Sequence, residues 1–164
     1  MYEVSAMPLV PFRQHFPEVA ENETRMIIVY EEYPHIGLPL GVYLFEEMYC
    51  DEPGCDCRRV VWYVVCSCRK GIQAMIGWGW EPREYYVKWM GDDDPLIIDN
   101  FKGPDLHMPS PYTDISDILL RFVKEVLVND REYTERIKRH YKMFRELVES
   151  GRYKPKYPTE ETER

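Results

Sequence analysis

The sequence lacks long apolar runs, since no window approaches the about 18 uncharged apolar residues that a transmembrane helix needs. It also lacks an excess of basic charge, with 21 Lys and Arg against 29 Asp and Glu and a net charge of −8. Nucleic acid and membrane surfaces attract proteins through positive charge, so neither is expected as a partner. The first ten residues lack the basic and apolar regions of a signal peptide, and we therefore expect a cytoplasmic protein.

Catalytic signatures are missing as well. There is no nucleophile elbow, P-loop or dinucleotide fingerprint. The acidic run 92–94 lacks the ligand alternation and glycine of a calcium loop, and we interpret it as a solvated loop. These absences favour a binding role over catalysis.

The length of 164 residues fits one domain. Segments rich in β-branched and aromatic residues predict strands over 25–33, 42–49, 58–68, 72–80 and 84–90. Their short connections favour antiparallel neighbours, and hence a meander of four or five strands. On the strand 72–80, Gly77 and Gly79 share one face, which indicates a bulge or the close approach of another backbone.

Two helices are expected after a long proline-containing connection over 91–112. The first begins at Asp114 as N-cap, and the second runs from Asp130 to about Ser150. One apolar seam follows the second helix, comprising Tyr133, Ile137, His140, Phe144 and Leu147. The prediction is a single α+β domain over 1–150, an antiparallel sheet carrying a C-terminal helical hairpin, with an N-terminal arm over 1–24 and a mobile tail over 151–164.

Five cysteines lie within nineteen residues: Cys50, Cys55, Cys57, Cys66 and Cys68. In the reducing compartment that we expect, thiols bind metal or lie buried rather than pair. Cys50 ends one strand and Cys57 begins the next, so a hairpin would place them about 5 Å apart. Pro53 and Gly54 occupy the positions that a type II turn favours, which would fold Cys55 back toward them.

Three thiolates at this spacing favour Zn²⁺, since they are too few for a standard iron–sulfur cluster. The cysteine loop between two strands is therefore a predicted metal-binding hairpin loop. Two alternatives remain, namely unliganded buried thiols and a disulfide between Cys50 and Cys57. Cys66 and Cys68 lie about 30 Å further along the next strand and are interpreted as buried structural thiols. A redox role for these two would require an exposed thiol of low pKa, which a strand face does not provide.

The fourth zinc ligand must come from another segment. His140 lies on the seam of the second helix, which is expected to pack over the same sheet, and we predict it as that ligand. The alternatives are water, one of two acidic residues of the loop, Asp51 and Asp56, or one of the remaining histidines, His15, His35 and His107.

Three segments resemble a group of uncharacterised bacterial cytosolic proteins. The most specific is YCDEPGCDCRRV at 49–60, and FPEVAENETR at 16–25 and YTERIKRHYKMFRE at 133–146 extend the similarity. The resemblance implies that the cysteine loop and the histidine helix belong to one unit. It implies no reaction.

The functional expectation is a zinc-binding protein whose metal is structural and which binds a protein or small-molecule partner. The alternative is a metal-dependent hydrolase with an open zinc position, in which Glu52, Asp51 or Asp56 acts as base. Four saturating ligands would favour the structural role, and three ligands with water would favour chemistry.

Overall fold

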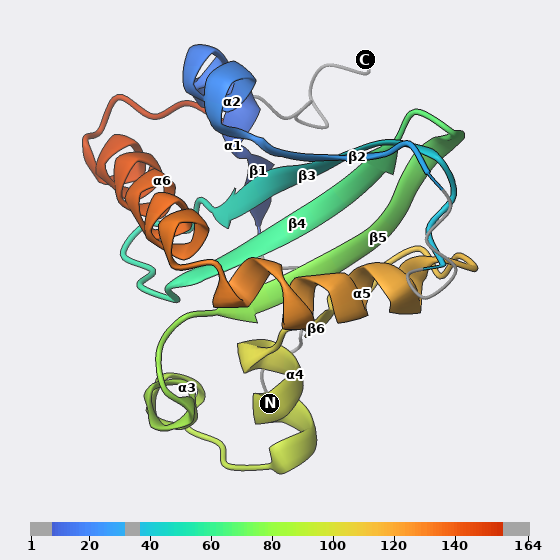
Figure 1. Ribbon diagram of the computed structural model, residues 1–164. Coiled ribbons are helices and arrows are strands. Elements are labelled where there is room, and N and C mark those ends of the chain that lie inside the picture. Colours follow the sequence, from blue (N-terminus) through green and yellow to red (C-terminus); the bar gives the residue numbers. More distant parts are fainter. Residues whose placement is uncertain (1–7, 32–36, 156–164) are drawn as a thin grey trace, which may run out of the picture.

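The computed structural model describes residues 8–31 and 37–155 and contains a six-stranded antiparallel sheet with helices on both of its faces (Figure 1). The strands are β1 (Leu9–Pro11), β2 (Arg25–Val29), β3 (Gly41–Cys50), β4 (Arg59–Cys66), β5 (Arg69–Gly79) and β6 (Asp105–Leu106). The order is β1-β3-β4-β5-β6, and β2 also pairs with β3. The predicted meander is thereby confirmed, because β3, β4 and β5 are consecutive and antiparallel.

The helices are α1 (Phe12–His15), α2 (Pro17–Glu23), α3 (Arg83–Met90), α4 (Pro95–Lys102), α5 (Ser116–Glu125) and α6 (Arg131–Glu149), with a 3-10 turn at Leu127–Asn129. Helix α5 contacts β5 and helix α6 contacts β4, so both cover one face of the sheet (Figure 1). On that face the buried Trp62 indole donates a hydrogen bond of 2.9 Å to the Tyr133 hydroxyl of α6. The predicted α+β class, with C-terminal helices on an antiparallel sheet, is confirmed.

Local sequence signals account for the ends of α6. The Asp130 side chain accepts a hydrogen bond from the backbone N–H of Tyr133, which is the N-cap that the sequence predicts. The prediction for α5 differs, since its N-cap is Ile115 and not Asp114. The Asp114 carboxylate forms an ion pair with Arg69 at the start of β5 instead.

The segment 84–90 is a helix, and the predicted strand is wrong. Pro82 lies in extended conformation at the N-cap of α3, and Gly91 ends the helix with a left-handed φ of 66°. The aromatic and β-branched content of this segment suggests a strand, but these flanking residues favour a helix. The connection that follows it also contains a helix, α4, whose N-cap is Asp94.

The glycine face of β5 receives α3 and α4, which lie on the side of the sheet away from α5 and α6 (Figure 1). A Cβ atom on Gly79 would overlap the Tyr86 hydroxyl of α3, and one on Gly77 would overlap the Arg59 guanidinium. The backbone of Gly103 lies directly against the carbonyl of Gly77. The predicted close approach of another backbone is thus present at Gly77, whereas at Gly79 the approaching group is a side chain.

The N-terminal arm packs on the body of the domain, with Val10 of β1 and Phe12 of α1 both buried. Predictions for residues 1–7, for the segment 32–36 and for most of the tail, 156–164, lie outside the described residues. In the described part of the tail, the Tyr153 hydroxyl donates a hydrogen bond of 2.7 Å to Asp51. Across the described ranges, no helix combines the length and the apolar character needed to cross a membrane.

Candidate metal centre

The cysteine loop, residues 50–58, connects β3 to β4 through a tight turn. The backbone N–H of Cys55 donates to the carbonyl of Glu52 at 3.1 Å, and Gly54 has a φ of 75°. These are the hydrogen bond and the left-handed residue of a type II turn with Pro53 at its second position. The predicted turn is confirmed, and it returns Cys55 to the base of the loop.

The thiols of Cys50, Cys55 and Cys57 lie within hydrogen-bonding range of one another, and we call them the thiol cluster. Cys50 and Cys57 are buried and Cys55 is half-buried. The backbone N–H of Glu52 points at the Cys50 sulfur at 3.4 Å, and the N–H of Cys57 points at the Cys55 sulfur. Two of the three sulfurs therefore accept from the N–H group two residues further along the loop.

The cluster favours one thiolate at Cys55. Contact with the Cys50 thiol, and then with the Cys57 thiol, lowers the pKa of Cys55 to about 3. The pKa of Cys50 is raised to about 11, first by its contact with Cys55, and that of Cys57 is raised because it donates to both other sulfurs in a buried site. Cys50 and Cys57 therefore hold their protons and donate to the Cys55 thiolate.

Two guanidinium groups compensate negative charge at the cluster. Arg145 of α6 donates to the carbonyls of Cys50 at 2.8 Å and Glu52 at 2.9 Å, and its charge further lowers the pKa of Cys55. The buried Arg59 at the start of β4 is also close enough for the three sulfurs to affect its pKa, which burial lowers. Such a positive environment stabilises thiolates over thiols.

Further contacts anchor the loop to the helices on both faces of the sheet. The Tyr141 hydroxyl of α6 accepts from the backbone N–H of Arg58 at 3.1 Å and donates to Asp56 at 3.3 Å. The Tyr85 hydroxyl of α3 donates to the carbonyl of Asp56 at 2.5 Å. Glu149 accepts from the N–H of Gly54 at 2.7 Å, at the tip of the loop. The loop is thus hydrogen-bonded to both α6 and α3.

His140 contacts carboxylates, and this differs from the prediction that it completes the thiol site. Its ring is fully buried, and its Nδ1 lies 2.7 Å from Glu47 on β3 while its Nε2 lies 3.1 Å from Glu23 at the end of α2. The imidazole also stacks on Phe12, with ring centroids 4.5 Å apart. Because both ring nitrogens already contact carboxylates, a metal ion could be bound only after one of these contacts breaks.

The other proposed fourth ligands are also engaged elsewhere. The backbone N–H of His107 donates to the carbonyl of Met75, and its ring nitrogen Nδ1 lies toward Gly77. Burial, and then the charge of Arg59, lowers the pKa of His107 to about 4. His15 lies on α1, where its ring contacts Phe144 and Tyr153. Of the three remaining alternatives, His35 lies outside the described residues, and Asp51 and Asp56 accept hydrogen bonds from Tyr153 and Tyr141.

As the side chains stand, no group of three or more His, Cys, Asp or Glu in the described ranges is arranged to hold a metal ion. The chemistry of the donors nevertheless fits a thiophilic metal, because three sulfurs are adjacent and two receive backbone N–H donors. Convergence on one ion would require rotation of the cysteine side chains within the loop. The fit therefore extends to three sulfur ligands and does not include His140.

Sequence reasoning missed the contribution of α6 to the loop. Tyr141 and Arg145 are four residues apart, which places them on one helical face, and both contact the cysteine loop. From sequence these residues belong to a mixed, amphipathic surface, with charges of both signs. Only the direction in which α6 crosses the sheet identifies the face that meets the loop.

Comparison with known proteins found no matching family model, no matching curated protein and no matching solved structure. The resemblance to cysteine-loop proteins therefore stays a prediction, and the chemistry of the site must be argued from this chain alone.

Proposed function

We propose that the protein binds one Zn²⁺ through Cys50, Cys55 and Cys57, and that the metal stabilises a domain with a binding function. The observation that carries the proposal is that three cysteines lie in one turn-closed loop, close enough for each thiol to shift the pKa of the others. When bound, the ion would replace the shared protons between the sulfurs, since coordinated thiols are deprotonated.

The charge around the cluster supports this ligand set. Zn²⁺ with three thiolates carries one net negative charge, and Arg145 and Arg59 are the cations that face the loop. The N–H groups of Glu52 and Cys57 would remain donors to coordinated sulfurs. The fourth position would be filled by water or by a carboxylate such as Asp51 or Asp56, and not by His140.

The number and type of ligands favour a structural metal over a catalytic one. Catalytic zinc sites generally have histidine and carboxylate ligands with one or two sulfurs at most, whereas sets of three or four cysteines are typical of structural sites. Two of the three bases considered for a hydrolase are already engaged. Asp56 pairs with Arg58, and Asp51 accepts from Tyr153. The hydrolase with an open zinc position remains the second candidate, because the fourth position has no identified protein ligand.

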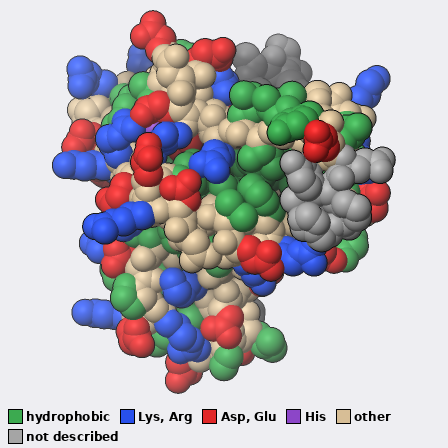
Figure 2. Space-filling model, in the orientation of Figure 1, with side chains coloured by type: hydrophobic (Ala, Val, Ile, Leu, Met, Phe, Trp, Pro, Cys, Tyr) green, Lys and Arg blue, Asp and Glu red, His purple; other side chains and the backbone are tan. Residues whose placement is uncertain are grey.

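A binding function is supported by exposed apolar side chains on β2. Met26 is 50% exposed and Ile28 is 56% exposed, although both belong to a strand. Exposed apolar residues on such a strand are typical of protein contact surfaces. On the face shown in Figure 2, basic and acidic side chains are interspersed and no broad basic region forms, which disfavours nucleic acid as the partner.

The test is the metal content of the untagged chain purified under reducing conditions. We expect about one equivalent of zinc, with an X-ray absorption spectrum of three sulfurs and one lighter ligand. Cys55→Ser should lower the zinc content to less than about half an equivalent and lower the melting temperature. Absence of zinc from the wild-type chain, even after reconstitution with Zn²⁺, would contradict the proposal.

The matched control is Cys66→Ala, because Cys66 lies at the opposite end of β4 from the thiol cluster. This variant also removes the bridge between Cys66 and Cys68, but it should keep its zinc and lose only about 1–3 kcal/mol of stability. Equal metal loss in both variants would mean that the effect of Cys55→Ser reflects general instability and not coordination.

A further inference from the structure

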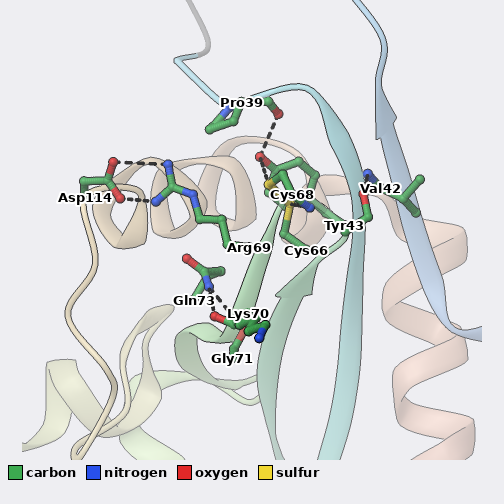
Figure 3. Close-up of a disulfide and its surroundings, with 11 residues drawn as sticks. Pro39, Val42, Tyr43, Cys66, Cys68, Arg69, Lys70, Gly71, Gln73 and Asp114 are labelled. Carbon is green, nitrogen blue, oxygen red and sulfur yellow. Dashed lines mark hydrogen bonds and ion pairs between the residues drawn. A yellow bond between two sulfur atoms is a disulfide. The ribbon is translucent and has the colours of Figure 1, made fainter.

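Cys66 and Cys68 form a disulfide across the turn between β4 and β5 (Figure 3). The strand predicted over 58–68 ends at Cys66, and the chain turns at residues 67–68, before β5 begins. The prediction for Cys68 is therefore wrong, because this residue is exposed in the turn; Cys66 is buried at the end of β4 as predicted, but it is bridged and not a free thiol. The objection to a redox role that concerned exposure no longer applies to Cys68.

The turn is held in place on β3. Ser67 donates its backbone N–H to the carbonyl of Val42 at 2.9 Å, and its hydroxyl accepts from the N–H of Val42 at 2.8 Å. Gly41 faces the turn with a φ of 151°, and a Cβ atom at this position would lie 3.0 Å from the Ser67 hydroxyl and 3.3 Å from the Cys66 sulfur. The close fit of Gly41 leaves no room for a side chain, and both sulfurs are consequently presented from a fixed backbone.

The two cysteines differ in accessibility. Cys68 is exposed at the tip of the hairpin, whereas Cys66 is 8% exposed and belongs to the core. The backbone N–H of Cys68 donates to the Cys66 sulfur at 3.2 Å. An external thiol can therefore reach Cys68 first, and the leaving Cys66 sulfur would receive a hydrogen bond that stabilises it as a thiolate.

Charges beside the turn come from Arg69, Lys70 and Asp114 (Figure 3). Arg69 follows Cys68 directly and is ion-paired with Asp114, while Lys70 is exposed. The Tyr43 hydroxyl donates to the carbonyl of Pro39 at 2.7 Å and lies 3.9 Å from the Cys68 sulfur. These side chains surround the turn with polar groups and carry one net positive charge, which favours the approach of a thiolate.

The same chain holds three unpaired cysteines in contact with one another and one disulfide between residues two positions apart. A bridge that closes so short a loop removes little entropy from the unfolded chain and is a weak structural staple. In a compartment that keeps thiols reduced, a disulfide is typically catalytic or redox-sensing.

We propose that Cys66 and Cys68 form a redox-active pair that undergoes thiol–disulfide exchange with a small cellular thiol of the glutathione type. The thiolate of the small thiol attacks the Cys68 sulfur and forms a mixed disulfide with it. The bond between Cys66 and Cys68 breaks, and its electron pair leaves with Cys66 as a thiolate. A second small thiolate then attacks the small-thiol sulfur of the mixed disulfide, which releases Cys68 as a thiolate. Two small thiols are oxidised to their disulfide, and the protein disulfide is reduced by two electrons.

The test uses the full chain, equilibrated under native conditions in mixtures of reduced and oxidised glutathione, quenched with acid and mapped by alkylation and peptide mass spectrometry. We expect the 66–68 pair to interconvert reversibly between dithiol and disulfide. In Cys66→Ser, which lacks the resolving sulfur, a mixed disulfide with one glutathione should accumulate at Cys68. In Cys68→Ser, the buried Cys66 should react at least about tenfold more slowly, because reactivity follows accessibility of the thiolate.

A measurement on the wild-type chain does not depend on the folding of a variant. When the oxidised protein is mixed with reduced glutathione and quenched rapidly with acid, the transient mixed disulfide should be trapped at Cys68 and not at Cys66. Reduction of the bridge only in denaturant, or trapping predominantly at Cys66, would overturn the proposal. Zinc should be retained throughout, which separates the thiol–disulfide exchange from metal binding by Cys50, Cys55 and Cys57. Failure of these three cysteines to bind metal would leave the exchange intact.

Discussion

Replacement of His140 distinguishes its two possible roles, since coordination predicts loss of metal and burial between carboxylates predicts loss of stability. Its partner Glu47 is almost fully buried, with 2% of its side chain exposed, and it also accepts from the Tyr49 hydroxyl at 2.6 Å. In His140→Leu this carboxylate keeps one donor but loses the imidazole. Removal of one partner from a buried pair costs about 3–5 kcal/mol. We therefore expect a decrease of that size in the free energy of unfolding, with full retention of zinc.

The assay is urea denaturation followed by tryptophan fluorescence, with metal content measured on the same samples. For a chain of this size, such a loss corresponds to a decrease of roughly 6–20 °C in melting temperature. His140→Asn places its amide near the position of Nδ1, retains an N–H donor for Glu47 and should cost less, about 1–3 kcal/mol. The Asn variant thus separates the loss of a hydrogen bond from the loss of packing.

A double-mutant cycle with Glu47→Gln provides the control. The neutral amide leaves no uncompensated charge, so His140→Leu should cost about 1–3 kcal/mol less in this background than in the wild type. A loss below about 1 kcal/mol in the single His140→Leu variant would refute the reasoning from the buried carboxylate. A lower zinc content in His140→Leu than in the wild type would instead indicate that His140 is a ligand.

Three further predictions concern sites around this core. Gly79→Ala should destabilise the domain by about 1–3 kcal/mol in thermal unfolding, since its Cβ would displace both the hydroxyl and the ring of Tyr86; an unchanged melting temperature would contradict this close fit. The ion pair with Arg139, above all, lowers the pKa of Glu23 to about 2, so its contribution to stability is present above about pH 4.5 and is lost as the pH falls toward 2. Because Glu23 is partly exposed, that contribution is at most about 1 kcal/mol, and Glu23→Gln should abolish it in unfolding measured at pH 6 against pH 3. Arg145→Met should keep the helix but weaken zinc affinity by about tenfold or more, through loss of the donors to the loop carbonyls; unchanged affinity in a competition titration would contradict the role of this cation.

Local signals in the sequence determined the elements whose structure depends on neighbours along the chain. Pro53 and Gly54 predict the turn that returns Cys55 to the base of its loop, because proline fixes φ at the second turn position and glycine tolerates the positive φ required at the third. Asp130 predicts the start of α6 for the same kind of reason. The β-branched and aromatic content of the segments that form β3, β4 and β5, together with short connections, predicts the meander.

Propensity failed where local preference conflicted with packing. The aromatic segment of α3 has strand-forming composition, yet the helix places Tyr86 in the space that Gly79 leaves empty. The side chain of one element and the missing side chain of another are complementary only after folding. Sequence indicated the close approach at the glycines but not the residue that fills it.

Sequence alone determined that three cysteines share one loop and that His140 faces inward from its helix, since both follow from turn chemistry and helical periodicity. Only the tertiary structure decided what these groups contact. The crossing of α6 brings Tyr141 and Arg145 to the loop and His140 to Glu47 and Glu23, and the position of the β4–β5 turn joins the other two cysteines as a disulfide. The physical reason is that periodicity fixes the face on which a side chain lies, whereas its partner depends on the angle and register at which two distant elements pack.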